Sequence, residues 1–166
     1  ELPEFPDRWL DAFTRVDEVW APSQFVMSAV AAKSPVPVVH MPHGIGFEAT
    51  PDRSALGLPE GKLLFLVMYD MRSHQARQNP QAAIAAFDGA FSGVAGVGLV
   101  VKVANADFDP EGFRELEASV QAVPDAVLIS ENFSRQKVYD LEASCDVYLS
   151  LHRAEGWGLN LAESMF

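Results

Sequence analysis

The sequence predicts an α/β fold with a doubly wound parallel sheet, and three observations support this prediction. Four short apolar runs after residue 60 have the length of strands that are buried on both faces. Segments with the apolar spacing of helices alternate with these runs, and the connections between them are short. Proline and capping residues stand where these helices would begin. A sheet of this Rossmann-like kind binds ligands at the carboxyl ends of its strands.

The residues before position 61 follow a different pattern. Near the amino terminus apolar residues have helical spacing, and Val19–Ala21 has the pattern of a short strand. Ser23 can cap a helix over 24–33, and 36–39 form another apolar strand. The stretch 44–60 is polar and contains prolines, so we expect a linker there. Residues 1–43 would then form the end of a preceding domain and its connection.

The region 61–166 is expected to form the main domain. Its predicted strands are Leu63–Tyr69, Val97–Ala104, Ala126–Ile129 and Val147–Leu151. Its predicted helices cover 81–91, 110–121, 135–143 and the end of the chain. Asp109 and Ser134 have side chains that can cap two of these helices, and Pro80 and Pro110 suit first helical turns. Between the first strand and first helix, residues 72–80 are expected to form a polar loop.

Composition limits the classes of function. The chain has 166 residues, 49% of them hydrophobic, which is enough for a core. The formal charge of −11 leaves no fold-wide basic field, so nucleic-acid binding is not expected. No apolar window is long enough to span a membrane, and nothing resembles a signal peptide. The chain begins at Glu1, so we expect a piece of a longer protein.

Cys145 is the only cysteine, which excludes an internal disulfide and suits a reducing compartment. Its apolar neighbours favour a small buried side chain over a nucleophile. No histidines have the spacing of zinc ligands, and neither a Walker motif nor a GxGxxG turn follows the first strand of the layer.

The strongest candidate site follows the last strand. Gly156 and Gly158 let the backbone approach a ligand, and the helix after them presents free N–H groups that suit a diphosphate. Glu155 and Glu163 offer carboxylate oxygens that can hold sugar hydroxyls. An ordinary glycine turn with two solvated glutamates is the alternative interpretation of the same pattern.

Cations also stand near strand ends. Arg72 and Arg77 lie in the loop after the strand 63–69, and arginine is suited to bidentate contact with phosphate. Lys102 lies near the carboxyl end of the strand 97–104. Solvated arginines and a lysine at a sheet edge are the alternatives for these positions.

Several segments in this order resemble one enzyme family. The run His152-Arg153-Ala154-Glu155-Gly156-Trp157-Gly158-Leu159-Asn160-Leu161-Ala162-Glu163 is similar to the paired-glutamate motif of retaining, nucleotide-sugar-dependent glycosyltransferases of family 4, group 1. These enzymes have two Rossmann-like domains that face each other across a cleft, the GT-B fold. Further segments similar to the family are Asp17–Phe25, Val36–Gly44, Arg77–Pro80 and Cys145–Tyr148.

The resemblance implies a role for each matching residue. Glu155 would be the catalytic residue, contacting hydroxyls of the donor sugar, and Glu163 would bind the ribose of the nucleotide. The family uses an Arg/Lys pair on the diphosphate in place of a metal, but Gln78 stands at the lysine position here. The donor-binding residues expected on this basis are Arg72, Arg77, Lys102, Gly156, Trp157, Gly158, Leu159 and Glu163.

The resemblance also implies a reaction, in which a sugar moves from a UDP- or GDP-linked donor to a glycan or lipid-linked acceptor with retention. No cofactor or metal is expected, and the full-length protein would be cytoplasmic or peripheral to a membrane. Because most of the amino-terminal acceptor domain is missing, we expect this chain alone to transfer no sugar. The alternatives are a non-catalytic domain that binds a nucleotide or phosphorylated metabolite, and another sugar-nucleotide enzyme on the same fold.

Overall fold

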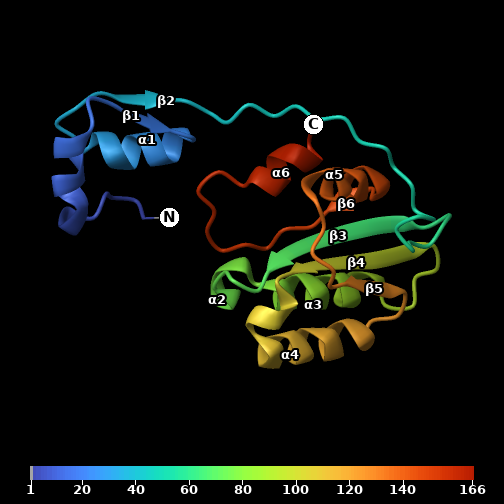
Figure 1. Ribbon diagram of the computed structural model, residues 1–166. Coiled ribbons are helices and arrows are strands. Elements are labelled where there is room, and N and C mark those ends of the chain that lie inside the picture. The colour runs from blue at the N-terminus through green and yellow to red at the C-terminus, as the bar shows by residue number, and fades with distance from the viewer. Residues whose placement is uncertain (1) are drawn as a thin grey trace. The chain divides into compact units, whose positions relative to one another are not determined.

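A computed structural model describes residues 2–166 and divides the chain into two compact units. The first unit contains the residues up to Ile45 together with Ala154–Leu159. The second contains Gly46–Arg153 and Asn160–Phe166. The glycine turn near the carboxyl end therefore belongs with the amino-terminal residues, whereas the helix after it belongs almost wholly to the larger unit. Figure 1 labels the strands and α-helices of both units.

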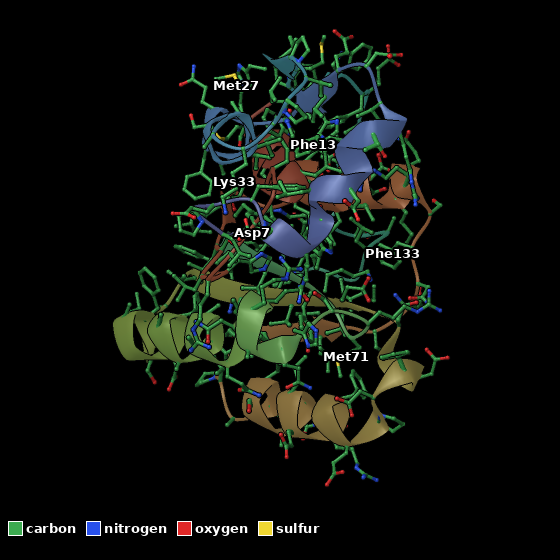
Figure 2. The ribbon with its side chains drawn as sticks, turned by 90° about the vertical axis from the view of Figure 1, so that its left-hand side faces the viewer. Asp7, Phe13, Met27, Lys33, Met71 and Phe133 are labelled. Atoms are coloured by element: carbon green, nitrogen blue, oxygen red, sulfur yellow. The ribbon has the colours of Figure 1, made fainter. Side chains whose placement is uncertain are left out.

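The first unit is a short parallel strand pair with two helices. Its elements are the 3₁₀ helix η1 (Asp7–Arg15), β1 (Val19–Ala21), α1 (Gln24–Ala31) and β2 (Val38–His40). The hydroxyl of Ser23 accepts a hydrogen bond from the Val26 N–H, which confirms the predicted cap. Lys33 donates to Asp7 across 2.7 Å, and the two side chains lie together in Figure 2. This ion pair joins the end of α1 to the start of η1.

The second unit contains a four-stranded parallel sheet, as the sequence predicts. Its strands are β3 (Leu63–Asp70), β4 (Val97–Ala104), β5 (Ala126–Ile129) and β6 (Val147–Tyr148), in the order β5-β4-β3-β6. The strand β6 is shorter than the predicted run to Leu151. The Leu149 N–H still bonds to Leu66, but the carbonyl of Leu151 accepts from Asn79, which lies beyond β3. The chain therefore leaves the sheet after two paired residues.

Helices cover both faces of this sheet, which makes it doubly wound. They are α2 (Gln75–Gln78), α3 (Pro80–Phe91), η2 (Ala106–Phe108), α4 (Pro110–Gln121), α5 (Arg135–Ser144) and α6 (Leu159–Ser164). Figure 1 shows α3 and α4 on one face, and α5 and α6 on the other. The helix α2 occupies part of the expected polar loop. It ends at Asn79, whose φ of +52° is left-handed, and Pro80 then starts α3.

The core lies in two layers because side chains alternate across a strand. Val67 and Tyr69 of β3 join the cluster beneath α3 and α4. Leu66 and Met68 point to the opposite layer, which includes Leu141 of α5. Val100 of β4 lies in that second layer as well, so the side chain of Lys102, two residues further on, projects to the α5 face.

The stretch 46–60, most of the expected linker, belongs to the second unit and is hydrogen-bonded to the rest of it. Arg53 donates through Nε to the Ser144 carbonyl, through Nη1 to the Lys62 carbonyl, and through Nη2 to Asp146. The Asp146 carboxylate also accepts from the Leu64 N–H across 2.7 Å. One guanidinium thus connects this stretch to the end of α5 and to the beginning of β3.

Replacing Arg53 by methionine should therefore destabilise the second unit. The substitution removes the hydrogen bonds to two carbonyls and the ion pair with Asp146, which should lower the free energy of unfolding by about 1–3 kcal/mol. Urea denaturation followed by circular dichroism measures this change. Arg114→Met is the control, because Arg114 is exposed on α4. Equal midpoints for the two variants would contradict the anchoring role of Arg53.

Candidate functional site

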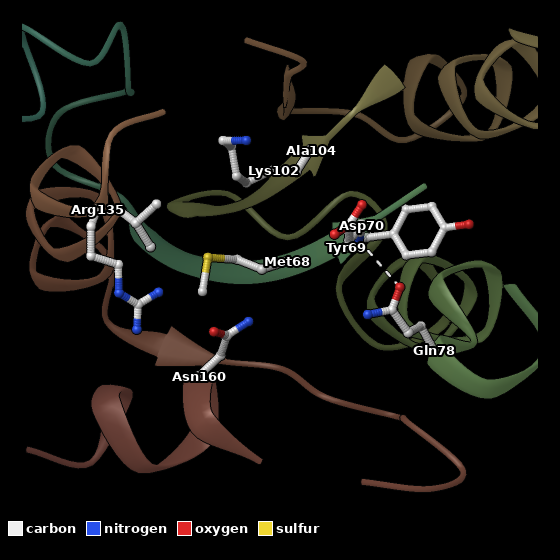
Figure 3. A pocket seen from close by; sticks show the side chains of 9 residues that line it. Met68, Tyr69, Asp70, Gln78, Lys102, Ala104, Arg135 and Asn160 are labelled. Carbon is white, nitrogen blue, oxygen red and sulfur yellow. Dashed lines mark hydrogen bonds between the residues drawn. The ribbon is translucent and has the colours of Figure 1, made fainter. Parts of the chain in front are cut away.

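A pocket of 240 Å³ opens at the carboxyl ends of β3 and β4. Residues of β3, α2, β4, α5 and α6 line it, namely Met68, Tyr69, Asp70, Gln78, Lys102, Ala104, Arg135, Val138 and Asn160. Figure 3 shows these side chains around the strand ends. This is the edge at which parallel α/β sheets bind ligands, and all nine residues belong to the second unit.

Lys102 supplies a buried positive charge to this pocket. It pairs in register with Met68, is 4% exposed, and donates from Nζ to the Val103 carbonyl across 2.9 Å. Burial lowers the pKa of Lys102, and the nearby charge of Asp70 opposes that effect. An ammonium with little water around it attracts an anion more strongly than a solvated one does. Its expected role in binding the donor stays a prediction, but its position at the pocket suits it.

Arg135 is a second cation of the pocket, and sequence reasoning did not single it out. It is the first residue of α5, directly after Ser134, whose hydroxyl accepts from the Lys137 N–H. Its Nε donates to the Tyr139 hydroxyl across 3.1 Å, and its Nη2 pairs with Glu163. A cation in the first turn of a helix opposes the helix dipole, and this unfavourable placement was the signal that could have identified it.

Glu163 lies behind Arg135 and is not among the residues that line the pocket. Its side chain is buried in α6, with Oε1 on the Arg135 guanidinium and Oε2 without a hydrogen-bond partner among residues 2–166. The expected contact of Glu163 with a ribose stays a prediction. In the structure its carboxylate is engaged with a cation that faces the pocket.

Glu142 is the second carboxylate in this region that sequence reasoning missed. It lies seven residues after Arg135, two turns along the same face of α5. It is 8% exposed, and neither carboxylate oxygen has a hydrogen-bond partner among the described residues. Burial raises the pKa of Glu142 to about 7, the charge of Glu163 adds to this, and Arg135 opposes it. Near neutral pH this carboxyl group is therefore close to half protonated.

The arginines of the loop after β3 lie outside this pocket. Arg77, on α2, donates from Nη2 to the Ser73 hydroxyl across 2.7 Å. Arg72 is exposed and lines a separate cleft with Phe108 and Glu111. Gln78 does line the pocket, where its Oε1 accepts from the Asp70 N–H, as the dashed line in Figure 3 marks. The phosphate-binding roles of Arg72 and Arg77 stay predictions.

The glycine turn, Ala154–Leu159, belongs to the first unit. Gly158 has a φ of +77°, so its left-handed backbone requires glycine, and a Cβ added at Gly156 would meet open space. The Trp157 ring lies edge-on to His43, with ring centroids 5.6 Å apart. Glu155 lies in this turn, and the structure does not test its expected catalytic role or the donor contacts of Gly156–Leu159.

Two classes of feature are absent from residues 2–166. No group of three or more histidine, cysteine and acidic side chains is arranged to hold a metal ion. No helix in this range has the length and apolar character needed to cross a bilayer.

Comparisons with known proteins point to one fold. No protein-family model matches the chain, and no curated protein does. Among solved structures, a UDP-forming alpha,alpha-trehalose-phosphate synthase from Burkholderia xenovorans matches with a TM-score of 0.71 and 13% identity, over 95% of this chain and 45% of its own. The C-terminal domain of a glycosyl transferase group 1 family protein from Francisella tularensis matches with a TM-score of 0.58 and 19% identity, over 72% and 63%.

A third match is the pneumococcal O-GlcNAc transferase, solved in complex with UDP and GlcNAc, with a TM-score of 0.61 and 17% identity over 99% of this chain and 32% of its own. The chain spans less than half the length of the trehalose-phosphate synthases that it resembles. At these identities the likeness establishes the fold alone. The chain has the Rossmann-like α/β architecture that these glycosyltransferases contain.

The buried Glu142 carboxyl should make stability depend on pH. Its folded pKa of about 7 lies above the usual value, so the folded state holds the proton more tightly and loses stability as the pH rises past the unfolded pKa. Glu142→Gln should be up to about 3 kcal/mol more stable than wild type at pH 8.5, and nearly equal to it at pH 4.5.

Thermal and urea unfolding at the two pH values measure this difference. Glu115→Gln is the matched control, because Glu115 is exposed on α4. A Glu142→Gln protein that gains no stability at pH 8.5 relative to pH 4.5 would show that Glu142 carries no such penalty.

Proposed function

We propose that this chain is the donor-binding part of a retaining glycosyltransferase that uses a UDP- or GDP-linked sugar. The pocket at the ends of β3 and β4 is the observation that carries the proposal. It places the charges of Lys102 and Arg135 at the ligand edge of a Rossmann-like sheet. The ordered resemblance to family 4 enzymes and the fold shared with glycosyltransferases of known structure support the same conclusion.

In this proposal the pocket holds the phosphate end of the nucleotide. Lys102 gives an unscreened charge, and Arg135 gives a planar guanidinium that can bind two oxygens at once. The two cations stabilise the negative charge that develops on the leaving diphosphate, which lowers the barrier to transfer. They would take over the task of the lysine that Gln78 replaces, with Arg77 as a further contact.

The remaining roles follow the family pattern. Glu155 would contact the donor sugar, the amides after it would face the sugar and diphosphate, and Glu163 would hold the ribose. Transfer itself would also need an acceptor-binding domain, and the acceptor would be a glycan or a lipid-linked saccharide. No metal enters the proposed reaction, because the cations supply the charge compensation.

Titration with UDP, GDP and ADP tests the proposal. At least one diphosphate should bind, and Lys102→Met should weaken its binding about tenfold or more, since a charge-assisted contact is lost. Glu163→Gln should also weaken nucleotide binding, because an amide oxygen accepts from the ribose hydroxyls less strongly than a carboxylate does.

Arg114→Met, which removes an exposed cation from α4, is the control and should bind like wild type. Isothermal titration calorimetry gives the dissociation constants. If none of the three diphosphates binds, or if Lys102→Met binds as tightly as wild type, the pocket is not the phosphate site.

A further inference from the structure

Two buried carboxylates share one cation behind the pocket. Glu142 and Glu163 are 8% and 5% exposed, and three of their four oxygens have no hydrogen-bond partner among residues 2–166. Arg135 pairs directly with Glu163 and acts on Glu142 through its charge. A single guanidinium cannot compensate two buried negative charges, so Glu142, which has no direct partner among the described residues, is poised to hold a proton.

Among residues 2–166, Arg135 is the cation whose charge acts on Glu142. A small cavity of 30 Å³ beside it is lined by Cys145, Asp146 and Tyr148, among others. The Asp146 carboxylate is already paired with Arg53, and burial raises the pKa of the Cys145 thiol to about 12, so the thiol stays neutral. Within the described part of the chain, Glu163 and Arg135 are the charged groups that act on Glu142.

Arg135 contacts both the buried Glu163 carboxylate and the pocket. Its side chain is 47% exposed, whereas that of Glu163 is 4% exposed. The exposed portion lines the same 240 Å³ pocket as Lys102 and Asn160, and Figure 3 shows the guanidinium there. An anion bound in this pocket therefore competes with the buried carboxylates for the same guanidinium.

We infer that Arg135 is shared between the pocket and the buried Glu142–Glu163 pair, so that binding of a nucleoside diphosphate draws a proton onto Glu142. The inference rests on the proposed function and deepens it. When the guanidinium turns to the phosphate, the carboxylates lose their compensating charge, and a proton from solvent replaces it. The ligand and the proton then favour each other, which makes binding tighter at lower pH.

The size of the effect follows from the protonation of Glu142 in the free protein. Its pKa of about 7 means that the carboxyl is mostly ionised at pH 8.5. If the bound form holds the proton, affinity should fall about tenfold between pH 7.0 and 8.5. The phosphate groups of UDP are largely ionised across this range, so most of the change belongs to the protein.

The test is calorimetric titration of the wild-type chain with UDP, in HEPES and Tris buffers whose ionisation enthalpies differ. The difference in heat between the buffers counts the protons taken up. Near one proton per UDP is expected at pH 8.0, together with the tenfold loss of affinity by pH 8.5. Glu142→Gln should take up less than half as many protons and show a flatter pH profile, whereas Glu115→Gln should match wild type.

The outcomes separate this inference from the proposed function. Tight UDP binding with no proton uptake, or equal uptake in wild type and Glu142→Gln, overturns the inference and leaves donor binding intact. No binding of UDP, GDP or ADP at any pH overturns both. If Glu142→Gln does not fold, the infrared difference spectrum of wild type decides, since UDP should increase the band of a protonated carboxyl group.

Discussion

The parallel register between β3 and β4 is the constraint on which the site depends. Eight consecutive residues pair from Leu63↔Val97 to Asp70↔Ala104, so both strands end at the same edge. This register sets Lys102 beside Met68 and turns both toward the α5 face. A shift by one residue would send the lysine into the apolar layer beneath α3 and α4. The position of the buried cation is therefore a consequence of strand pairing.

Much of the architecture could be predicted because it rests on local signals. The strand Val97–Ala104 and the helix after Asp109 have the predicted bounds, since an apolar run and a cap residue act within a few residues. The predicted element boundaries were wrong where contacts with residues distant in sequence set the local structure. The short helix α2 and the early end of β6 depend on each other. The Asn79 side-chain amide donates to the Leu151 carbonyl, and the Arg77 carbonyl accepts from the Arg153 N–H. No local pattern encodes such contacts.

The candidate site divides in the same way. Lys102 could be singled out because a cation inside an apolar run is conspicuous in sequence. Glu142 could not, since charged residues on a helix are usually solvated, and for Arg135 the only local signal is a cation in the first turn of a helix. Their importance arises only when α6 brings the Glu163 carboxylate against α5, so that one half-exposed guanidinium faces two buried acids. The motif predicts a binding role for Glu163, but it contains no signal for the ion pair of Glu163 with Arg135.

A buried acid without a hydrogen-bond partner lowers stability, and a neutral side chain at position 142 would avoid that cost. Uncompensated groups of this kind are expected where a fold gives up stability for function. The cost at Glu142 has a physical use if Arg135 is needed elsewhere. A guanidinium fully neutralised by two carboxylates would be held too firmly to turn toward a phosphate. When one of the two acids can be protonated, the guanidinium can turn toward a phosphate, because a proton from solvent then replaces its charge beside the acids. The same imbalance that weakens the fold at high pH therefore keeps the cation of the pocket available for a ligand.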